Sequence, residues 1–389
     1  MRRSVALLIL VIAGCKKAPP VQFSDADLAA NRAALEQNLA DKPSCARPVL
    51  HPGTATPVDL STRFKLPSEC SDLKKAIDTE AAKGPMAELP FGVLDAPRAS
   101  ECLASVTAFV RSAVSADSVC ASPYSEPEAG AQFKPQFIAY IIALQARTLA
   151  KTSPAEGLAL AMDGVRFFQD GTRGGTLMQA MLSVAARKLV IERGALPIIS
   201  AKPELDDVTC AEVSRDVDAL LASEPSLHDI LVAEANWIGT EHGLKHLKGK
   251  ERDDGAEALA ASVANHAAWG MACPPGASVN ACRSALERPS AAPQTKGNDT
   301  LDRGGGLPPY VARWGEPIVR LAMLRFQLEV KEHGCPKATT QEPWATILAP
   351  AVLGDSLRAD KTATGFTLRS PAWMDRPADE WPVTCPSPI

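Results

Sequence analysis

The distribution of proline constrains the fold of this chain more strongly than any other feature of its sequence. Of the 32 prolines in 389 residues, 13 lie in residues 1–135, four in residues 136–273 and 15 in residues 274–389. Proline fixes φ, removes a backbone donor and interrupts both helices and sheets. The proline-poor stretch therefore predicts a helical centre between two irregular flanks. A hydrophobic content of 46% is sufficient to give that centre a buried core.

The start of the centre predicts a helical hairpin. The segment FIAYIIALQARTLAK (137–151) is apolar on all sides, as in a helix inside a bundle. Ser153, Pro154 and Glu156 then supply the N-cap, the first helical residue and the capping-box partner of a second helix that ends near Gly171. With its small residues and tight turn, the hairpin resembles a tetratricopeptide unit. No second copy follows in register at the roughly 34-residue spacing of such repeats.

Periodicity predicts further helices on both sides of this hairpin and little strand. Gly194 and Gly334 are candidates for helix C-termini. Because short connections favour antiparallel neighbours, the predicted fold class is mainly α: an irregular antiparallel helical bundle or an α-solenoid-like, weakly tetratricopeptide-like array with loop-rich flanks. The other predicted helices cover about residues 25–41, 70–83, 99–116, 176–193, 204–222, 226–248, 254–269 and 314–333, and the predicted strand covers residues 365–369.

The same patterns divide the chain into segments. We expect a helical body over residues 24–272, made of a proline-rich part (24–135) and the helical centre (136–272). Residues 273–309 are low in hydrophobic side chains, which is typical of a loop or linker. Residues 310–389 are expected to form a C-terminal helix and a proline-rich tail that pack on the body.

The first 15 residues carry an export signal. Two arginines precede an apolar run at residues 5–12, and the segment closes with Ile12, Ala13, Gly14 and Cys15. Eight apolar residues are far fewer than the roughly 20 that a transmembrane helix needs, so the segment is typical of a secretory signal. Its last four residues resemble the lipobox of bacterial lipoproteins. The resemblance implies cleavage before Cys15, which removes a signal peptide at residues 1–14, and a lipid on the Cys15 sulfur.

The lipoprotein resemblance implies a protein that is anchored to a membrane and does not span it. Two or three acyl chains, at about 0.8 kcal/mol per buried CH₂, exceed what stable attachment needs. Residues 15–23 would be the lipidated cysteine and its tether, and Lys16 in place of aspartate favours the outer membrane. We therefore expect a location in the bacterial cell envelope, with the membrane and other envelope proteins as partners. A formal net charge of −4 argues against nucleic acid as a partner.

Cysteine usage agrees with export, because cysteines in an oxidising compartment are interpreted first as disulfides. Nine cysteines remain besides Cys15, an odd number that leaves at least one unpaired within the chain. Cys210 falls on the apolar stripe of a predicted helix and is expected to be free and buried. The absence of any C-x-x-C motif excludes the minimal motifs of a thioredoxin-like pair and a zinc ribbon. The expected disulfides join sequence neighbours: Cys45–Cys70, Cys102–Cys120, Cys273–Cys282 and Cys335–Cys385.

The predicted helix 226–248 carries charged side chains inside its apolar stripe, namely Glu234, Glu241 and Lys245. Unpaired buried carboxylates are costly, so either the stripe lines a wet polar pocket or these groups are paired in an internal ion network. We favour the internal ion network over the polar pocket. The candidate partners from neighbouring helices are Arg147, Arg166 and Arg187.

Two histidines on the same helix have the spacing of metal ligands. His242 and His246 stand at i and i+4, which places both imidazoles on one face. The motif is not H-E-x-x-H, because no acidic residue lies between the histidines to act as a base. Since no third ligand is defined, we predict neither a metal nor another cofactor. His242 and His246 remain the place where a divalent ion would be sought first.

The block LGDSL at residues 353–357 resembles the nucleophile block of GDSL-type esterases, in which Ser356 would attack an ester carbonyl. In that family the block follows a strand near the start of the domain, and an Asp-x-x-His follows far downstream. Here 32 residues follow Leu357, and none of them is histidine. We therefore interpret the block as a chance match in a loop.

Together these patterns predict a lipid-anchored envelope protein that acts as a binding or scaffolding module, and no catalytic activity is expected. The alternative is a hydrolase or metal-dependent enzyme with its site on the 226–248 helix. A dry ion network around Glu234 and Glu241 would favour the first function. A cleft in which His242, His246 and a third ligand converge would favour the second.

Overall fold

The computed structural model shows a mainly helical fold with a small sheet, which confirms the predicted fold class. The predicted helices at 25–41 and 254–269 lie outside the residues that it describes. The described residues are 58–59, 66–82, 89–115, 119–120, 135–173, 175, 177–201, 205–239, 273–287, 308–374 and 380–385.

Most described residues belong to helices. The α-helices are α2 (Ser71–Ala81), α3 (Ala99–Val114), α5 (Pro135–Leu149), α6 (Pro154–Asp170), α7 (Leu177–Leu189), α8 (Leu196–Ala201), α9 (Asp207–Ala222), α10 (Leu227–Gly239), α13 (Val279–Glu287), α15 (Pro308–His333) and α16 (Trp344–Leu348). The remaining elements are the 3-10 turns η1 (Ser68–Cys70) and η2 (Phe91–Asp95), the π-helical turn η3 (Val190–Ala195), and the strands β1 (Val58–Asp59), β2 (Val119–Cys120), β3 (Arg358–Lys361), β4 (Gly365–Arg369) and β5 (Trp381–Thr384).

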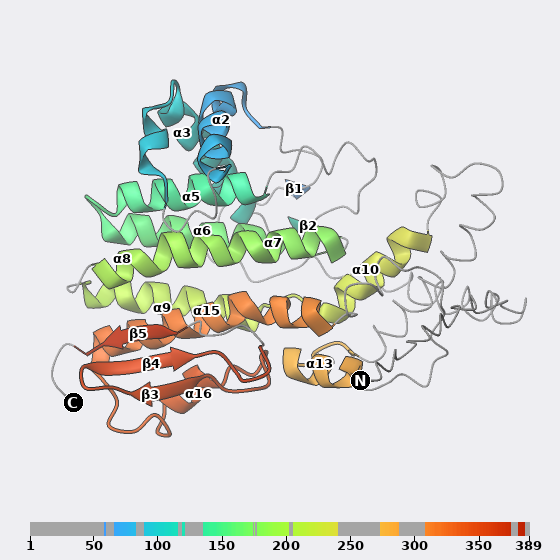
Figure 1. The fold of residues 1–389 in the computed structure, drawn as a ribbon, viewed down its shortest axis with the longest axis vertical. Helices are drawn as coiled ribbons and strands as arrows, with labels where there is room; N and C mark the ends of the chain where they lie inside the picture. The colour runs from blue at the N-terminus through green and yellow to red at the C-terminus, as the bar shows by residue number, and fades with distance from the viewer. Residues whose placement is uncertain are drawn as a thin grey trace, which may run out of the picture.

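The helices lie in successive layers (Figure 1). The first layer contains α2 and α3, and the layers that follow contain α5 with α6, then α7 continuing into α8, then α9 beside α15. The sheet of β3, β4 and β5, together with α16, closes the far end of the stack. The array therefore follows chain order up to α9, whereas α15 returns from the C-terminal part of the chain to pack against α9 and α7.

The α5–α6 hairpin is built as the sequence predicts. The Ser153 hydroxyl accepts a hydrogen bond from the Glu156 backbone N–H at 3.4 Å, and Pro154 is the first helical residue. The two helices approach each other closely at Gly157, where a Cβ atom would lie 2.6 Å from the Ala146 carbonyl oxygen. The small residues of the hairpin thus have a packing function at the helix crossing.

The prediction that the helix after this hairpin stops at Gly194 is wrong, because α7 continues through η3 into α8. In η3 the Leu196 N–H donates to the Ile191 carbonyl, five residues earlier. Pro197 accounts for this wider turn, since proline has no N–H and its ring would collide with the carbonyl four residues earlier in a regular α-helix. The π-helical turn lets one continuous rod cross the stack.

Buried apolar side chains form two clusters that share α15. The first, which we call the hairpin core, joins α2, α3, α5, α6, η3, α8 and α9. The second, which we call the cap core, joins the start of α7 with α10, α13, α16, β4 and β5. From α15, Leu321, Leu324 and Leu328 belong to the hairpin core, whereas Trp314 and Phe326 belong to the cap core. A long helix with apolar side chains on two faces is the expected wall between two cores.

Polar contacts also hold α15 in place. The Arg320 guanidinium donates to Glu192 of η3 at 2.7 Å. The Gln327 amide donates to the Ser200 hydroxyl of α8 at 3.1 Å and accepts from the Trp381 indole of β5 at 3.3 Å, so one side chain joins both sides of α15. Although α15 has 26 residues, neither it nor any other described helix is both long and apolar enough to cross a membrane.

The C-terminal tail contains an antiparallel sheet in the order β3-β4-β5, and β4 is the strand that the sequence predicts. The prediction that residues 273–309 form a loop or linker is wrong for their first part, which contains α13 and a disulfide between Cys273 and Cys282. Helix α13 packs on α15, and its first N–H groups donate to the carbonyls of Val352 and Leu353 at 2.9 and 3.0 Å. This segment is therefore a structural part of the cap core.

Two of the predicted disulfides and the predicted free cysteine are confirmed. Cys273 bonds to Cys282, and Cys335 bonds to Cys385, so that both disulfides lie in the cap. Cys210 is free and buried on α9. Burial raises the pKa of the Cys210 thiol, which keeps this side chain neutral among its apolar neighbours.

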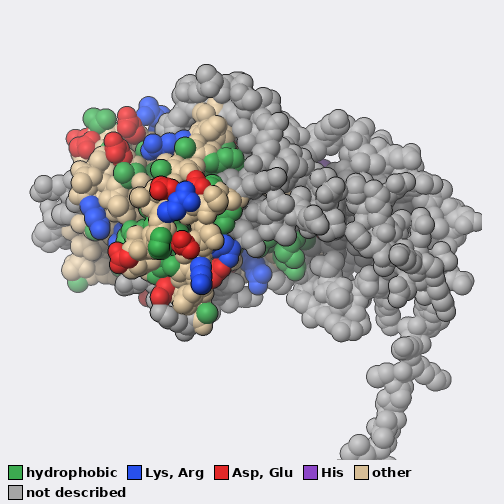
Figure 2. All heavy atoms as spheres, turned by 90° about the horizontal axis from the view of Figure 1, so that it is seen from above, with side chains coloured by type: hydrophobic (Ala, Val, Ile, Leu, Met, Phe, Trp, Pro, Cys, Tyr) green, Lys and Arg blue, Asp and Glu red, His purple; other side chains and the backbone are tan. Residues whose placement is uncertain are grey.

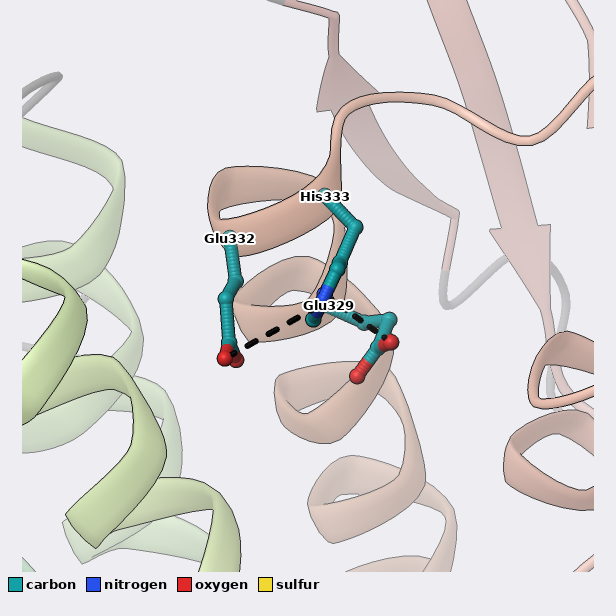
Figure 3. A group of neighbouring side chains, drawn as sticks. All are labelled: Glu329, Glu332 and His333. Atoms are coloured by element: carbon teal, nitrogen blue, oxygen red, sulfur yellow. Dashed lines mark ion pairs between the residues drawn. The ribbon is translucent and has the colours of Figure 1, made fainter.

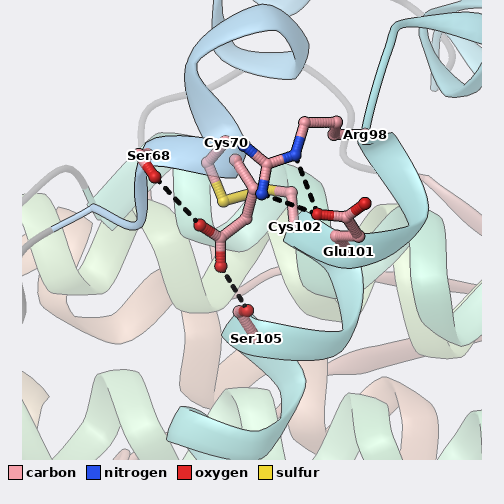
Figure 4. Close-up of a disulfide and its surroundings, with 7 residues drawn as sticks. Ser68, Cys70, Arg98, Glu101, Cys102 and Ser105 are labelled. Atoms are coloured by element: carbon pink, nitrogen blue, oxygen red, sulfur yellow. Dashed lines mark hydrogen bonds and ion pairs between the residues drawn. A yellow bond between two sulfur atoms is a disulfide. The ribbon is translucent and has the colours of Figure 1, made fainter.

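The predicted pairs Cys45–Cys70 and Cys102–Cys120 are wrong, because Cys70 bonds to Cys102 (Figure 4). The packing of η1 against α3 brings the Cα atoms of Cys70 and Cys102 to 4.7 Å, although 32 positions separate them in the chain. Cys45 lies outside the described residues. Proximity along the chain misled the prediction because the short helices in this flank fold back on each other.

Hydrogen bonds reinforce the same junction (Figure 4). The Glu69 carboxylate accepts from the Ser105 hydroxyl of α3 at 2.7 Å and from the Ser68 hydroxyl at 3.3 Å. The bond from Ser105 is the main reason that the pKa of Glu69 is lowered. On the same helix, Arg98 and Glu101 form an exposed ion pair with an N···O distance of 2.7 Å.

Candidate functional site

Glu234 is the described member of the polar group predicted on the 226–248 helix. The other members, Glu241, His242, Lys245 and His246, lie outside the described residues. Helix α10 places the half-buried Glu234 against the start of α7, where its Oε2 accepts the Leu177 N–H at 2.7 Å. Burial raises the pKa of Glu234, and the bond from Leu177 opposes that rise. Glu234 thus satisfies one of the unpaired N–H groups at a helix N-terminus.

The three arginines considered as partners of this group have other contacts. Arg187 makes a bidentate pair with Glu224, with both N···O distances at 2.7 Å. Arg166 donates to the Ser223 hydroxyl at 2.9 Å. Arg147 lies over an aromatic ring of η2, with its guanidinium carbon 5.5 Å from the ring centre. The predicted ion network around Glu234, Glu241 and Lys245 stays a prediction, since Glu241 and Lys245 lie outside the described residues; a different ion network is centred on Glu224 in the turn between α9 and α10.

This corner network binds the α9–α10 turn to α6 and α7. The side chains of Arg187 and Glu224 are 0% and 1% exposed, so their charges depend on each other. The Gln169 amide of α6 donates to Glu224 Oε2 and to a backbone carbonyl of α9, both at 2.8 Å. Arg173 donates to the Ser223 carbonyl. Sequence reasoning missed Glu224 because a glutamate in a turn has no periodicity that would indicate burial.

A second polar cluster ends α15 (Figure 3). Glu329, Glu332 and His333 follow one another at i, i+3 and i+4, and each places one potential ligand atom within 4.8 Å of the others. His333 Nδ1 lies 3.1 Å from Glu329 Oε1, and His333 Nε2 lies 4.0 Å from Glu332 Oε1. Arg325 donates to the second oxygen of Glu329 at 2.6 Å. The spacing E-x-x-E-H was the signal in the sequence that could have indicated this cluster.

The LGDSL block forms a turn whose parts have structural contacts. Gly354 has φ +67°, and a Cβ atom there would lie 1.9 Å from Ser278 Oγ of the α13 segment. The Asp355 carboxylate accepts from the Ser356 N–H and from the Trp373 indole, both at 2.7 Å. The leucines on both sides of the turn are buried in the cap core. Glycine, aspartate and leucine in this block are therefore explained by packing.

A groove with a volume of about 320 Å³ opens between α2, α5 and α7. Tyr140 lies in its wall, where burial raises the pKa of the hydroxyl and the nearby Arg193 lowers it. Lys74 and Asp78 form an ion pair at its edge. Seen from the α2–α3 end, acidic, basic and apolar side chains alternate over the described surface (Figure 2). The groove is lined by Lys74, Ile77, Asp78, Ala81, Pro135, Gln136, Phe137, Tyr140 and Leu182.

These arrangements differ in what they can do. The corner network and the LGDSL turn hold elements together, because their polar atoms bind other parts of the fold. The groove and the α15 cluster present polar side chains to solvent and can take a ligand. Comparisons of the chain with protein-family models, with curated proteins and with solved structures found no match.

Proposed function

We propose that this protein is a bacterial lipoprotein, anchored through a lipid on Cys15 in the outer membrane, whose helical body binds a partner in the cell envelope. The cationic and apolar residues before Cys15 support the anchor, and Lys16 supports the outer membrane. The disulfides at Cys70–Cys102, Cys273–Cys282 and Cys335–Cys385 support an oxidising compartment, since disulfides of this kind are rare in reducing ones.

The groove between α2, α5 and α7 is the observation that carries the binding role. Its volume of about 320 Å³ lies at the lower end of the range for ligand pockets. Apolar side chains such as Ile77 and Leu182 line it together with the Tyr140 hydroxyl and the Gln136 amide. Such a wall fits a short protein segment that inserts one apolar side chain and pairs its polar groups with the edge.

The frame of the groove supports the same role. Helix α2 follows η1, which the Cys70–Cys102 disulfide and the Glu69–Ser105 hydrogen bond hold to α3. Helices α5 and α7 belong to the hairpin stack. A binding site on elements held in this way needs little reorganisation, which lowers the cost of association.

Metabolic labelling with a palmitate analogue tests the anchor. We expect label on the wild-type protein, sedimentation with outer-membrane fractions, and loss of both in Cys15→Ala. The matched control is Cys210→Ala, which removes a buried cysteine of the folded body and should keep the label. Label retained by Cys15→Ala would contradict the anchor.

Photo-crosslinking in the native envelope tests the groove. A crosslinking residue at Gln136, exposed at the edge of the groove, should give a discrete protein adduct. The same residue at Lys361, exposed on β3 at the other end of the stack, is the matched control and should give none. Leu182→Glu, which places a charge in the groove, should abolish the Gln136 adduct. Adducts that are equal at both positions would contradict this site.

A further inference from the structure

We propose that the last two turns of α15 bind a divalent cation of the zinc class through Glu329, Glu332 and His333 (Figure 3). The imidazole lies between two carboxylates, with Nδ1 next to Glu329 and Nε2 next to Glu332. The convergence that supports the site is that one nitrogen of His333 and one oxygen of each carboxylate lie within 4.8 Å of one another. Water would complete the coordination, as it does in open zinc sites.

The distances suit a small ion. Two ligands with metal bonds of about 2.0–2.1 Å lie about 3.3 Å apart around a tetrahedral centre. The observed separation between His333 Nδ1 and Glu329 Oε1 is 3.1 Å, which needs almost no adjustment. Glu332 Oε1 is 4.0 Å from the other nitrogen, Nε2, so the partly exposed Glu332 side chain must move toward the ion when it binds.

The charges at the site favour a cation. The end of a helix carries partial negative charge from its unpaired carbonyls, and two carboxylates add to it. Two cations stand on the same helix: Lys331 is the sequence neighbour of Glu332, and Arg325 binds the far oxygen of Glu329 and is shared with Asp218, which lies 3.2 Å away on α9. Arg325 thus orients the Glu329 carboxylate and leaves Oε1 facing the imidazole.

The backbone on both sides of the cluster is held in place. Gly334 ends the helix with φ +75°, and its N–H donates to the Val330 carbonyl at 2.9 Å. Cys335 follows directly and is bonded to Cys385 next to β5. Glu329 itself is 5% exposed. All three ligands therefore stand on backbone whose position is set before any ion binds, which lowers the cost of binding.

The ligand types select among cations. One imidazole with two carboxylates suits zinc and neighbouring transition ions, whereas magnesium prefers an all-oxygen octahedron. The test is isothermal titration calorimetry of the mature, tag-free protein with zinc chloride, and with magnesium chloride for comparison. We expect one site for zinc and no heat of binding for magnesium. His333→Gln and Glu332→Gln should each weaken zinc binding at least tenfold, and the double variant should abolish it.

His333 is 58% exposed, so His333→Gln should fold normally, which circular dichroism without metal verifies. The matched control is the double variant His242→Gln with His246→Gln, which removes the other histidine pair and should keep the zinc site. Absence of zinc binding to the wild-type protein would overturn the proposal. So would equal affinity in the wild-type protein and the His333→Gln and Glu332→Gln double variant, or loss confined to the His242 and His246 control.

Discussion

The hairpin core and the cap core are assembled in opposite ways. In the hairpin core, helices that follow one another in the chain pack in that order, as α5 and α6 do across a short capped turn. In the cap core, segments from the start of α7 to β5 meet; the Cys335–Cys385 disulfide joins positions 50 apart, and Cys273–Cys282 closes a short loop in the α13 segment. The comparison shows that the hairpin half is built mainly from elements that are close in the chain, while the cap half assembles segments that are distant in the chain.

The two regions can be observed separately, because all six tryptophans follow residue 236. Trp314 and Trp344 are buried in the cap core, and Trp373 and Trp381 pack against it. Tryptophan fluorescence therefore reports mainly on the cap, whereas far-ultraviolet circular dichroism reports mainly on the helices. Since α15 belongs to both cores, we expect the two signals to change together in urea, and each variant below tests that coupling.

The largest effect is expected where the corner network joins the two regions. Glu224→Ala leaves the fully buried Arg187 without its carboxylate, which should lower the free energy of unfolding by about 3–5 kcal/mol. Both signals should shift to lower urea concentration. Glu212→Ala, which removes an exposed carboxylate from α9, is the control and should change stability by less than about 0.5 kcal/mol. A loss below about 1 kcal/mol for Glu224→Ala would show that the pair is not essential.

Removing one disulfide from each region should come next. Cys335→Ala with Cys385→Ala opens a loop with a sequence separation of 50, and the expected loss is about 2–4 kcal/mol. The matched variant, Cys70→Ala with Cys102→Ala, opens a separation of 32 in the first layer. If the regions were independent, the first variant would shift only the fluorescence transition and the second only the dichroism transition. Coincident transitions in both would show a single cooperative unit.

A smaller effect is expected at the LGDSL turn in the cap. Gly354→Ala combines a left-handed backbone with a close approach to Ser278, and should cost about 1–3 kcal/mol. Gly276→Ala has a similar φ of +78° but no atom within 4 Å, so it measures the backbone contribution alone. Ser356→Ala should change stability by less than about 0.5 kcal/mol, because the Ser356 side chain is exposed. A large loss in Ser356→Ala would contradict the structural interpretation of the turn.

The smallest effect concerns pH at the contact between α10 and α7. Burial raises the pKa of Glu234 above its ordinary value of 4.5, so the folded state binds the proton more tightly than the unfolded state. Stability should therefore fall as pH rises through the interval between these two values. Glu234→Gln, which resembles the protonated form, should be more stable than the wild type at neutral pH and equal to it below pH 4.5. Urea unfolding across this range measures the difference, and a constant difference at every pH would contradict it.

The sequence predicted the hairpin half better than the cap half for a physical reason. Capping at Ser153 and the periodicity of α5 and α6 are local signals. The two helices and their cap form as these signals predict, because the helices pack against each other across a short turn. In contrast, α13 buries few side chains of its own and is held by contacts with α15 and with the 352–353 segment, so its own sequence resembled a linker. At Gly194 the local rule for a helix C-terminus failed, because α7 continues through η3 into α8 as one rod.

The candidate sites were predictable only in part, since side-chain partners are set by tertiary contacts. Periodicity located Glu234 on a buried face, but it could not show that the partner is the Leu177 N–H. Arg187, one of the three arginines considered as partners there, binds Glu224. Cys210 was predicted correctly because the stripe of a single helix determines its burial.

The position of α15 has a consequence for how the chain comes to fold. Leu321, Leu324 and Leu328 complete the hairpin core, yet they are synthesised roughly a hundred residues after α9. Until α15 is available, the helices that precede it have an apolar face uncovered. A chain that lacks α15 is therefore a client for holding chaperones. A message truncated before α15 would yield a substrate for proteolysis and not a smaller folded protein.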